Sequence, residues 1–316
     1  MLSSRIIMAT LFAMGLFGTT SASAQSIRFG AGQQGSQNYG VNAAIAQAVD
    51  THTDLDVTVQ AFGGATSYIP LIGSGELDMA AVVAPDLGDA VRGAGPFESM
   101  KQDNLRVVAP LFPSPVGLMV RADSGIKTIA DLKGKRVAWG IPAQASLVPY
   151  IRGALANGGL TQDDVELAPV ASVANGVAAL IDGSVDATLF ALRGGAVVEA
   201  DAALGGIRWL PFDASPEAVE RMQAQAPEAY LVPVDAEDNV VGVSEPIQTM
   251  AYDYVLVARG DLDDDTVTAV ATMLRDKGAE VAVSSKVLGT ISPESLARIY
   301  PDLPSHPAAT AVFQAQ

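Results

Sequence analysis

The sequence contains no cysteine and only two histidines among its 316 residues. Without cysteine the chain cannot form a disulfide, a thiolate metal site, an iron–sulfur cluster or the lipid-modified cysteine of a bacterial lipoprotein. His52 and His306 lie far apart in polar, surface-like sequence contexts, and no G-x-S-x-G motif occurs. We therefore expect no catalytic triad, no metal site and no cofactor, and hence no enzyme.

Positive charge is also scarce, with 19 Lys and Arg against 35 Asp and Glu and a formal net charge of −16. Such an acidic chain is repelled by nucleic acid and by anionic lipid surfaces, so neither is expected as a partner. The clusters Asp163-Asp164 and Asp263-Asp264-Asp265 stand at predicted helix starts. Capping and the helix dipole account for acids at such positions without a calcium site.

The longest apolar run near the N-terminus is too short for a membrane span. Arg5 precedes an apolar and small-residue stretch from 6 to 17, and Ala22-Ser23-Ala24 forms an A-x-A site before Gln25. About a dozen apolar residues fall short of the roughly 20 that a spanning helix needs. This layout predicts a signal peptide over residues 1–24 and a soluble mature protein in the bacterial periplasm.

The mature sequence alternates strand and helix patterns along its length. We predict strands at 26–29, 55–61, 77–83, 105–111, 116–120, 136–139, 165–169, 187–190, 205–211 and 249–258. Helices are predicted after the first glycine turn, at 66–73, 147–157 and 172–183, and from Asp263 to just before Gly278. Such alternation predicts an α/β fold in which helices flank mainly parallel sheets.

The strands fall into two similar units, which predicts two lobes with a cleft between them. We assign 25–121 and 248–316 to lobe I and 122–247 to lobe II, because the late strand can return to the first unit. The pattern loosens between 214 and 247, where prolines and acids gather. Open α/β sheets bind ligands beyond the carboxyl ends of their strands, so the turns at those ends are expected to face the cleft.

The turn 30–35 carries the G-x-G-x-x-G spacing of a dinucleotide-binding loop, and Asp54 or Asp56 follows about 20 residues on. An exported protein meets little nicotinamide cofactor outside the cytoplasm, which argues against a dinucleotide-binding loop. Gln33 and Gln34 are also bulky where such a turn presses against a pyrophosphate. We therefore interpret the glycines as a tight turn at a helix N-terminus, where free N–H groups attract any anion.

Several segments resemble a known family of receptors. Residues 27–39, 59–64, 74–78 and 182–190, and less specifically 120–127 and 131–137, resemble the TAXI family of solute receptors for TRAP transporters. The resemblance spans nearly the whole mature chain and fades between 214 and 247. It implies a hinged, two-lobed type II periplasmic binding protein without catalysis, whose partners are a small solute and membrane-embedded TRAP permease subunits. We expect a monomer.

The resemblance also implies which turns contact the solute. The residues at those positions are Gln33, Gln34, Ser36, Tyr39, Gly64, Ser67, Ala84, Gln144, Ser146 and Arg193. The family usually has smaller residues in place of the two glutamines and of Arg193, and a polar residue in place of Ala84. The glutamate and dicarboxylate ligands of the family therefore transfer poorly to this chain.

We predict a receptor that captures a small organic anion or amino acid. Arginine binds carboxylate through two parallel hydrogen bonds, which favours Arg193 as the carboxylate partner. The alternative is a surface arginine paired with Glu199 or Asp201. An ABC-importer receptor is the alternative within the binding class, and a periplasmic hydrolase is a more distant one.

Overall fold

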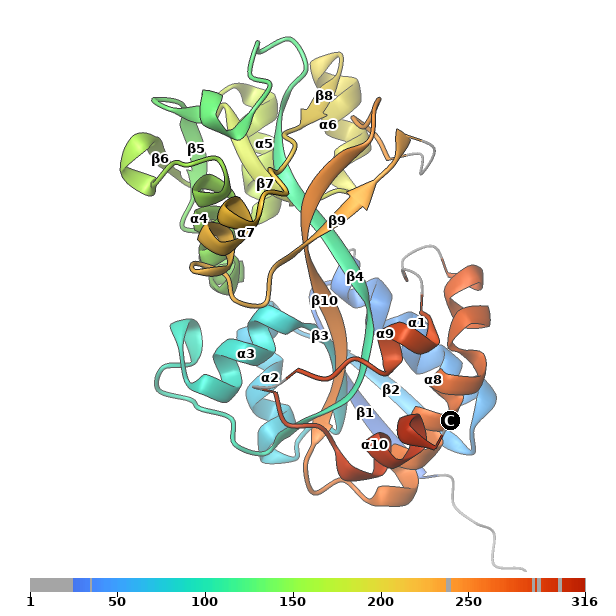
Figure 1. Ribbon diagram of the computed structural model, residues 1–316. Helices are drawn as coiled ribbons and strands as arrows, with labels where there is room; N and C mark the ends of the chain where they lie inside the picture. Colours follow the sequence, from blue (N-terminus) through green and yellow to red (C-terminus); the bar gives the residue numbers. More distant parts are fainter. Residues whose placement is uncertain are drawn as a thin grey trace, which may run out of the picture.

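The computed structural model describes residues 25–34, 36–236, 240–285, 288, 291–300 and 303–315. Within these residues the chain forms two α/β lobes, and long strands cross from one lobe to the other (Figure 1). The predicted two-lobed α/β class is thus confirmed. The predicted signal peptide, residues 1–24, and Gly35 of the glycine turn lie outside the described residues.

The first lobe alternates strands and helices from its first residue. Its elements are β1 (Gln25–Ala31), α1 (Gln37–His52), β2 (Leu55–Ala61), α2 (Ala65–Ser74), β3 (Met79–Val83) and α3 (Ala84–Arg92). β1 lies between β2 and β3, and both pairings are parallel. Val41, Ile45 and Val49 of α1 are fully buried against the sheet, so the apolar helical spacing in the sequence marks the packed face.

Two long antiparallel strands, β4 (Leu105–Arg121) and β10 (Ile247–Arg259), join the lobes. β10 pairs with β3 in the first lobe, and the far end of β4 pairs with β7 and β8 in the second. Arg121 ends β4 and Ile247 begins β10, so the predicted lobe boundaries fall at the second-lobe ends of both crossing strands.

The two strands predicted at 105–111 and 116–120 form the single strand β4. Pro110, Pro113 and Pro115 interrupt the sequence pattern, because proline cannot donate to a strand ladder. The register of β10 against β4 shifts at two points near these prolines, which lets the pairing continue past them.

The second lobe repeats the alternation of the first. Its elements are β5 (Arg136–Trp139), α4 (Val148–Asn157), β6 (Glu166–Pro169), α5 (Val173–Asp182), β7 (Ala187–Ala191), α6 (Ala196–Leu204), β8 (Ile207–Trp209), α7 (Pro216–Gln223) and β9 (Tyr230–Val234). β5 is parallel to β6 and β7. The sequence patterns missed α7 and β9, which fall in the proline-rich and acidic stretch between 214 and 247.

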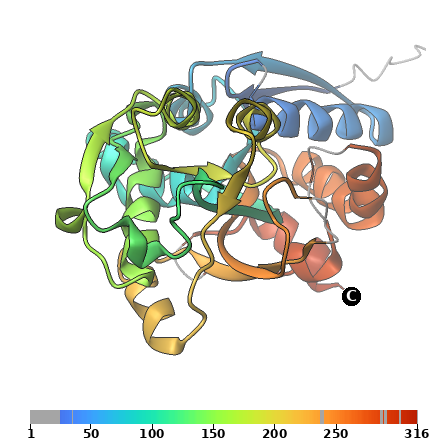
Figure 2. The same ribbon diagram turned by 90° about the horizontal axis from the view of Figure 1, so that it is seen from above.

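The C-terminal helices α8 (Asp264–Ser284), α9 (Pro293–Leu296) and α10 (Pro307–Gln314) return to the first lobe. Helices α1 and α8 pack together over the same core, as both views show (Figures 1 and 2). Asp263 caps α8 by accepting a hydrogen bond from the Thr266 N–H at 2.8 Å, as its position in the sequence predicts.

The predicted end of α8 before Gly278 is wrong, because the helix continues to Ser284. A Cβ atom at Gly278 would lie 2.8 Å from Cγ2 of Ile291. The glycine therefore allows close packing inside the helix and does not end it.

The expectation of a surface-like position is also wrong for His306, which is 1% exposed. Its backbone N–H donates to the Val107 carbonyl at 2.8 Å, and Ser305 forms an isolated bridge with the same strand β4. The polar neighbours of His306 in the sequence do not reveal this long-range pairing.

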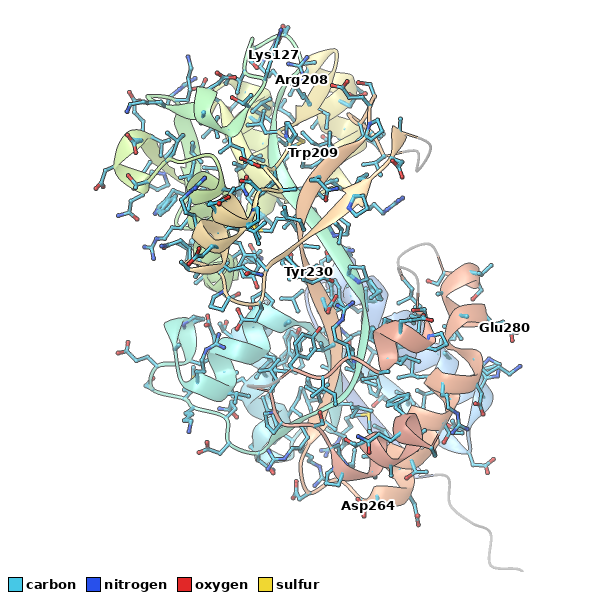
Figure 3. The ribbon with its side chains drawn as sticks, in the orientation of Figure 1. Lys127, Arg208, Trp209, Tyr230, Asp264 and Glu280 are labelled. Carbon is cyan, nitrogen blue, oxygen red and sulfur yellow. The ribbon has the colours of Figure 1, made fainter. Side chains whose placement is uncertain are left out.

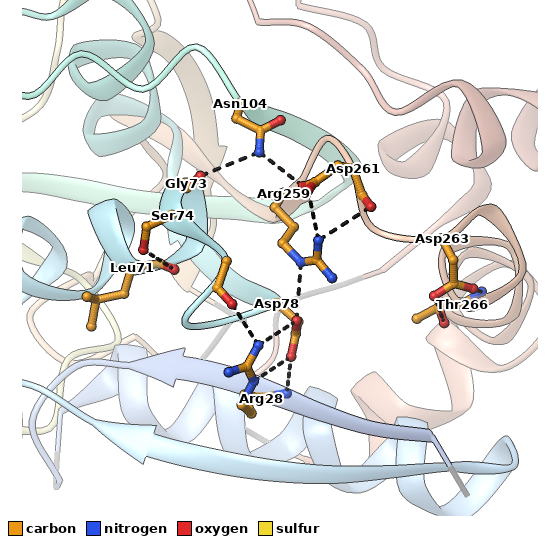
Figure 4. Close-up of polar contacts among 11 residues, drawn as sticks. Arg28, Leu71, Gly73, Ser74, Asp78, Asn104, Arg259, Asp261, Asp263 and Thr266 are labelled. Atoms are coloured by element: carbon orange, nitrogen blue, oxygen red, sulfur yellow. Dashed lines mark hydrogen bonds and ion pairs between the residues drawn. The ribbon is translucent and has the colours of Figure 1, made fainter.

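Both lobes contain the same arginine–aspartate anchor. Arg28 on β1 contacts Asp78 just before β3, and Arg136 on β5 contacts Asp186 just before β7. In each pair the carboxylate accepts from the backbone N–H and from the guanidinium of the arginine. Asp78 also accepts from Arg259 of β10 at 3.3 Å (Figure 4). The anchors therefore fix the first strand of each lobe to its third.

A buried carboxylate at the waist fastens the C-terminal segment to the crossing strands. Asp253 of β10 is 2% exposed and accepts hydrogen bonds from Tyr230, Tyr300 and Arg298. The Arg298 guanidinium also lies 5.3 Å from the centre of the Tyr230 ring. Tyr230 lies between the lobes (Figure 3), so this cluster connects β9, β10 and the segment after α9 where the lobes join.

Candidate solute site between the lobes

A cavity of about 530 Å³ lies between the two lobes. Its walls come from the turn after β1, the starts of α2 and α3, the turn after β5, the starts of α5 and α6, and strand β10. Five of the predicted contact residues line it, namely Gln33, Ser36, Gly64, Gln144 and Ser146. The strand-end turns of both lobes therefore meet at one site.

Besides α3, four helices that begin at this cavity are α1 and α2 of the first lobe and α5 and α6 of the second. The cavity wall contains Ser36 and Gln37 of α1, Gly64 and Ala65 of α2, Ser172 and Val173 of α5, and Gly195 and Ala196 of α6. Helix N-termini carry unpaired N–H groups and partial positive charge, so they favour anionic groups of a ligand.

The residues at these four helix starts differ in whether a side chain already accepts from an N–H group of the first turn. Ser36 and Ser172 cap their own helices by accepting from Tyr39 N–H and Asn175 N–H, each at 3.1 Å. Gly64 and Gly195 offer no capping side chain. At the starts of α2 and α6, therefore, a ligand oxygen can accept from the N–H groups of the first turn without competing with a capping side chain.

Asn38 and Asn42 hold the start of α1 in place. The buried Asn42 amide exchanges two hydrogen bonds with the backbone of Ala81 on β3, at 2.7 and 2.9 Å. Asn38 accepts from the Gly32 N–H at 2.7 Å and donates to the same Ala81 carbonyl. Neither asparagine was among the predicted site residues, although their four-residue spacing on one face of a helix is a detectable signal.

Aromatic rings from both lobes also line the cavity. Tyr252 and Tyr254 both face it, because alternate residues of strand β10 share one side. Tyr68 of α2 and Phe190 of β7 add rings from the two lobes. Burial raises the pKa of the Tyr252 hydroxyl above its ordinary value. Tyr252 and Tyr254 could not be predicted from the sequence, because β10 reaches the cleft only through its crossing between the lobes.

Asp86, in the first turn of α3, brings a carboxylate into the cavity wall. Burial raises its pKa from 3.8 to about 6, although the hydrogen bond from Ser146 opposes that rise. This bond joins the two lobes, because Ser146 belongs to the turn after β5. Ala84, the residue predicted at the same strand end, is buried and does not line the cavity.

The charged residues that line the cavity are both acidic, Asp86 and the exposed Glu199 of α6. No lysine, arginine or histidine is among the lining residues that the structure describes. A second contact between the lobes lies near Asp86, where Arg92 of α3 meets Glu228 at 2.6 Å. Positive potential in the cavity therefore comes from helix N-termini and not from side chains.

The other predicted contacts do not line this cavity. Gln34 and Ser67 are exposed, Tyr39 is half-buried, and Arg193 is exposed in the turn after β7. Arg193 lines a different cavity of about 590 Å³, together with residues of β4, β9 and α8. Its role as a carboxylate partner stays a prediction, as do the roles of the other three.

The fold matches solved structures at low sequence identity. One is the periplasmic aliphatic sulphonate binding protein SsuA from Escherichia coli, with a TM-score of 0.51 and 16% identity over 93% of this chain and 85% of that one. Another is a TctC solute binding protein from Polaromonas, with a TM-score of 0.51 and 17% identity over 93% and 96%. The ligand-binding component of an ABC-type import system from Staphylococcus aureus gives 0.51 and 14% over 92% and 84%.

No helix in the described part of the chain is long and apolar enough to cross a membrane. No group of three or more His, Asp or Glu residues that could hold a metal ion occurs in the same part. A profile of the NMT1-like family matches residues 29–316, which is nearly all of the sequence after the predicted signal peptide. The chain therefore belongs to the NMT1-like family.

Proposed function

We propose that this protein is an exported receptor that captures a small organic solute between its lobes and delivers it to a membrane transporter. One observation carries the proposal: helix N-termini from both lobes line a single cavity of about 530 Å³. Cavities of this size suit small ligands, and helix N-termini bind anionic groups such as carboxylates. The receptor would bind its solute without changing it chemically, and turnover of a solute would instead favour a periplasmic hydrolase.

Capture requires the lobes to move about the crossing strands. A solute favours the closed arrangement only if it binds that arrangement better than the open one. The helix N-termini meet this condition, because α1 and α2 belong to the predicted lobe I (25–121 and 248–316) and α5 and α6 to lobe II (122–247). An anionic group between them gains contacts with both lobes only when the cleft is closed.

The solute is proposed to be an amino acid or a small organic anion. Gln33, Ser36, Gly64, Gln144 and Ser146 are its proposed polar contacts. Gln144 accepts a hydrogen bond from Val173 N–H at 3.1 Å, so its amide already orders the start of α5. Arg193 lines the other cavity and is not among these contacts, so its role as a carboxylate partner stays a prediction from the sequence, which the Arg193→Ala variant tests.

We propose a TRAP-type permease as the transporter, on the resemblance of residues 27–39, 59–64 and 74–78 to TAXI receptors. An ABC importer is the alternative, since the similar structures include a component of an ABC-type import system. A neighbouring gene for a large permease without an ATPase gene would favour the TRAP system. Cleavage after Ala24 and release into the periplasm complete the proposal, and N-terminal sequencing of the exported protein tests them.

A thermal-shift experiment tests capture in the cavity. The exported protein, stripped of ligand by unfolding and refolding, is warmed with and without a bacterial metabolite extract. A solute at about 100 times its dissociation constant adds about 2.7 kcal/mol of stability. Ala174, in the first turn of α5, lines the cavity, and Ala178 of the same helix is exposed elsewhere.

The variants Ala174→Trp and Ala178→Trp form a matched pair. We expect the extract to stabilise the wild type and Ala178→Trp but not Ala174→Trp, whose indole occupies cavity space. Equal stabilisation of all three proteins would place binding outside the cavity. A flat response in the wild type would count against the receptor function itself.

A further inference from the structure

Asp86 is a carboxylate with no cationic partner among the residues that the structure describes. Its hydrogen-bond partner is the Ser146 hydroxyl, and it forms no salt bridge within the described residues. The side chain is half-buried in the wall of the cavity. A carboxylate in such surroundings is normally paired, because removing its charge from water is costly. The missing positive charge can come from what enters the cavity.

The residues around Asp86 suit a positively charged nitrogen. The rings of Tyr68, Tyr252 and Tyr254 line the same cavity, and the charge of Asp86 acts on all three hydroxyls by raising their pKa values. Aromatic faces attract ammonium groups, and carboxylates accept their hydrogen bonds. The cavity thus combines a carboxylate and rings near α3 with helix N-termini at its other walls.

We propose that Asp86 binds an ammonium group of the solute, so that the receptor selects amino acids or other amines over carboxylates that lack an amine. This inference rests on the proposed function and narrows its solute class. In an amino acid, the ammonium group meets Asp86 and the carboxylate meets the helix N-termini. The two ends of the solute would then match the two kinds of charge in the cavity.

A purely structural role for Asp86 is the competing explanation. An acid in the first turn of a helix stabilises the helix dipole, and Asp86 occupies that position in α3. That role explains an acid at this point in the helix, but an exposed acid fulfils it equally well. It does not explain why the carboxylate faces a cavity between the lobes with no cationic partner in the described part of the chain.

The proposal predicts a pH profile for binding. An ammonium group needs the ionised carboxylate, so affinity for an amine should fall about tenfold per pH unit below the Asp86 pKa of about 6. The other groups that face Asp86 are Asp89 on the same helix and the three tyrosine hydroxyls. Burial keeps the tyrosines neutral in this range, and the Asp86→Asn variant separates Asp86 from Asp89.

The probe is a bacterial metabolite extract split into two fractions. The extract is acidified and passed over a sulfonic-acid cation exchanger, which retains amines and amino acids and passes carboxylates, sulfonates and sugars. Each fraction is tested by thermal shift on the stripped protein. Glutamate against glutarate, and leucine against 4-methylpentanoate, serve as defined pairs that differ only in the amino group.

Three variants accompany the wild type. Asp86→Asn removes the charge and keeps an oxygen that can accept from Ser146. Ser146→Ala removes the contact between the lobes and keeps the charge, and Glu199→Gln removes the other lining acid. We expect the retained fraction to stabilise the wild type and Glu199→Gln, and Asp86→Asn to bind its active amine about 10- to 100-fold more weakly without the pH profile.

The outcomes separate this inference from the function on which it rests. Stabilisation by the unretained fraction alone would overturn the ammonium site and leave the receptor intact. Unchanged amine affinity in Asp86→Asn would also overturn it, as would a pH profile that Asp86→Asn keeps or Ser146→Ala loses, because the profile would then not belong to the Asp86 carboxylate. If neither fraction acts on the wild type, the receptor function fails together with the inference.

Discussion

Replacing Asp86 with asparagine should stabilise the solute-free protein. Burial raises the pKa of Asp86 from 3.8 to about 6, so the folded chain holds the proton more tightly than the unfolded chain does. This difference costs the folded state up to about 3 kcal/mol once the group is ionised in both states. Because the side chain keeps some exposure to the cavity, we expect a gain of about 1–3 kcal/mol in Asp86→Asn.

The stability difference between Asp86→Asn and the wild type should depend on pH, because the cost arises only when Asp86 is ionised. The cost is absent below pH 3.8, grows as pH rises, and is complete above about 6. Thermal unfolding of the solute-free proteins should therefore show Asp86→Asn about 2–6 °C more stable than the wild type at about pH 8. The two proteins should unfold at similar temperatures at about pH 4.

A contrary result would be informative. If Asp86→Asn is less stable than the wild type by more than about 1 kcal/mol at both pH values, Asp86 is a net stabiliser of α3. The view that the protein keeps this carboxylate for binding, at the expense of stability, would then be refuted. The Glu199→Gln variant is the control, since Glu199 is exposed and should change stability little.

Three further predictions concern the anchors, the packing and the arginine. In denaturant unfolding, Asp78→Asn should lower the free energy of unfolding by about 3–5 kcal/mol, and Asp186→Asn should lower it clearly less. The Asp78 side chain is 7% exposed and contacts two arginines, whereas the Asp186 side chain is 28% exposed and contacts one. Equal losses would contradict this account of the anchors. Gly176→Ala should lower the free energy of unfolding by about 1–3 kcal/mol, since the added Cβ would lie 2.3 Å from a threonine hydroxyl. Gly63→Ala, with open space around it, should change that free energy by no more than about 0.5 kcal/mol. An unchanged stability in Gly176→Ala would show that α5 can shift. In calorimetric titration, Arg193→Ala should leave the dissociation constant of the solute unchanged, because Arg193 lines the other cavity. A loss of solute affinity of about tenfold or more would instead support Arg193 as a carboxylate partner.

The sequence predicted the fold well where local patterns decide the structure. The strand at 55–61 and the strand at 136–139 have the bounds of β2 and β5, because each combines apolar or β-branched residues with a clear turn on either side. It failed where distant contacts decide. Gly278 continues α8 because Ile291 packs against it, and β9 pairs with β10 despite its proline.

The candidate site divides in the same way. The turns that carry Gln33, Gly64 and Gln144 were predicted to face the cleft because turns after parallel strands gather at one edge of a sheet. The family resemblance then pointed to these three residues, and all three line the cavity. Asp86 and Tyr252 were not predicted from the sequence as site residues. Tyr252 reaches the cavity from a strand more than 160 residues further along the chain than Asp86, and local patterns carry no information on that meeting.

Native mass spectrometry tests capture in the cavity most directly. The stripped wild type, Ala174→Trp and Ala178→Trp are each equilibrated with the same metabolite extract and sprayed from volatile buffer. We predict one added small molecule per chain in the wild type and in Ala178→Trp, and none in Ala174→Trp. An added molecule that Ala174→Trp retains in full, or no added molecule in the wild type, would contradict the account.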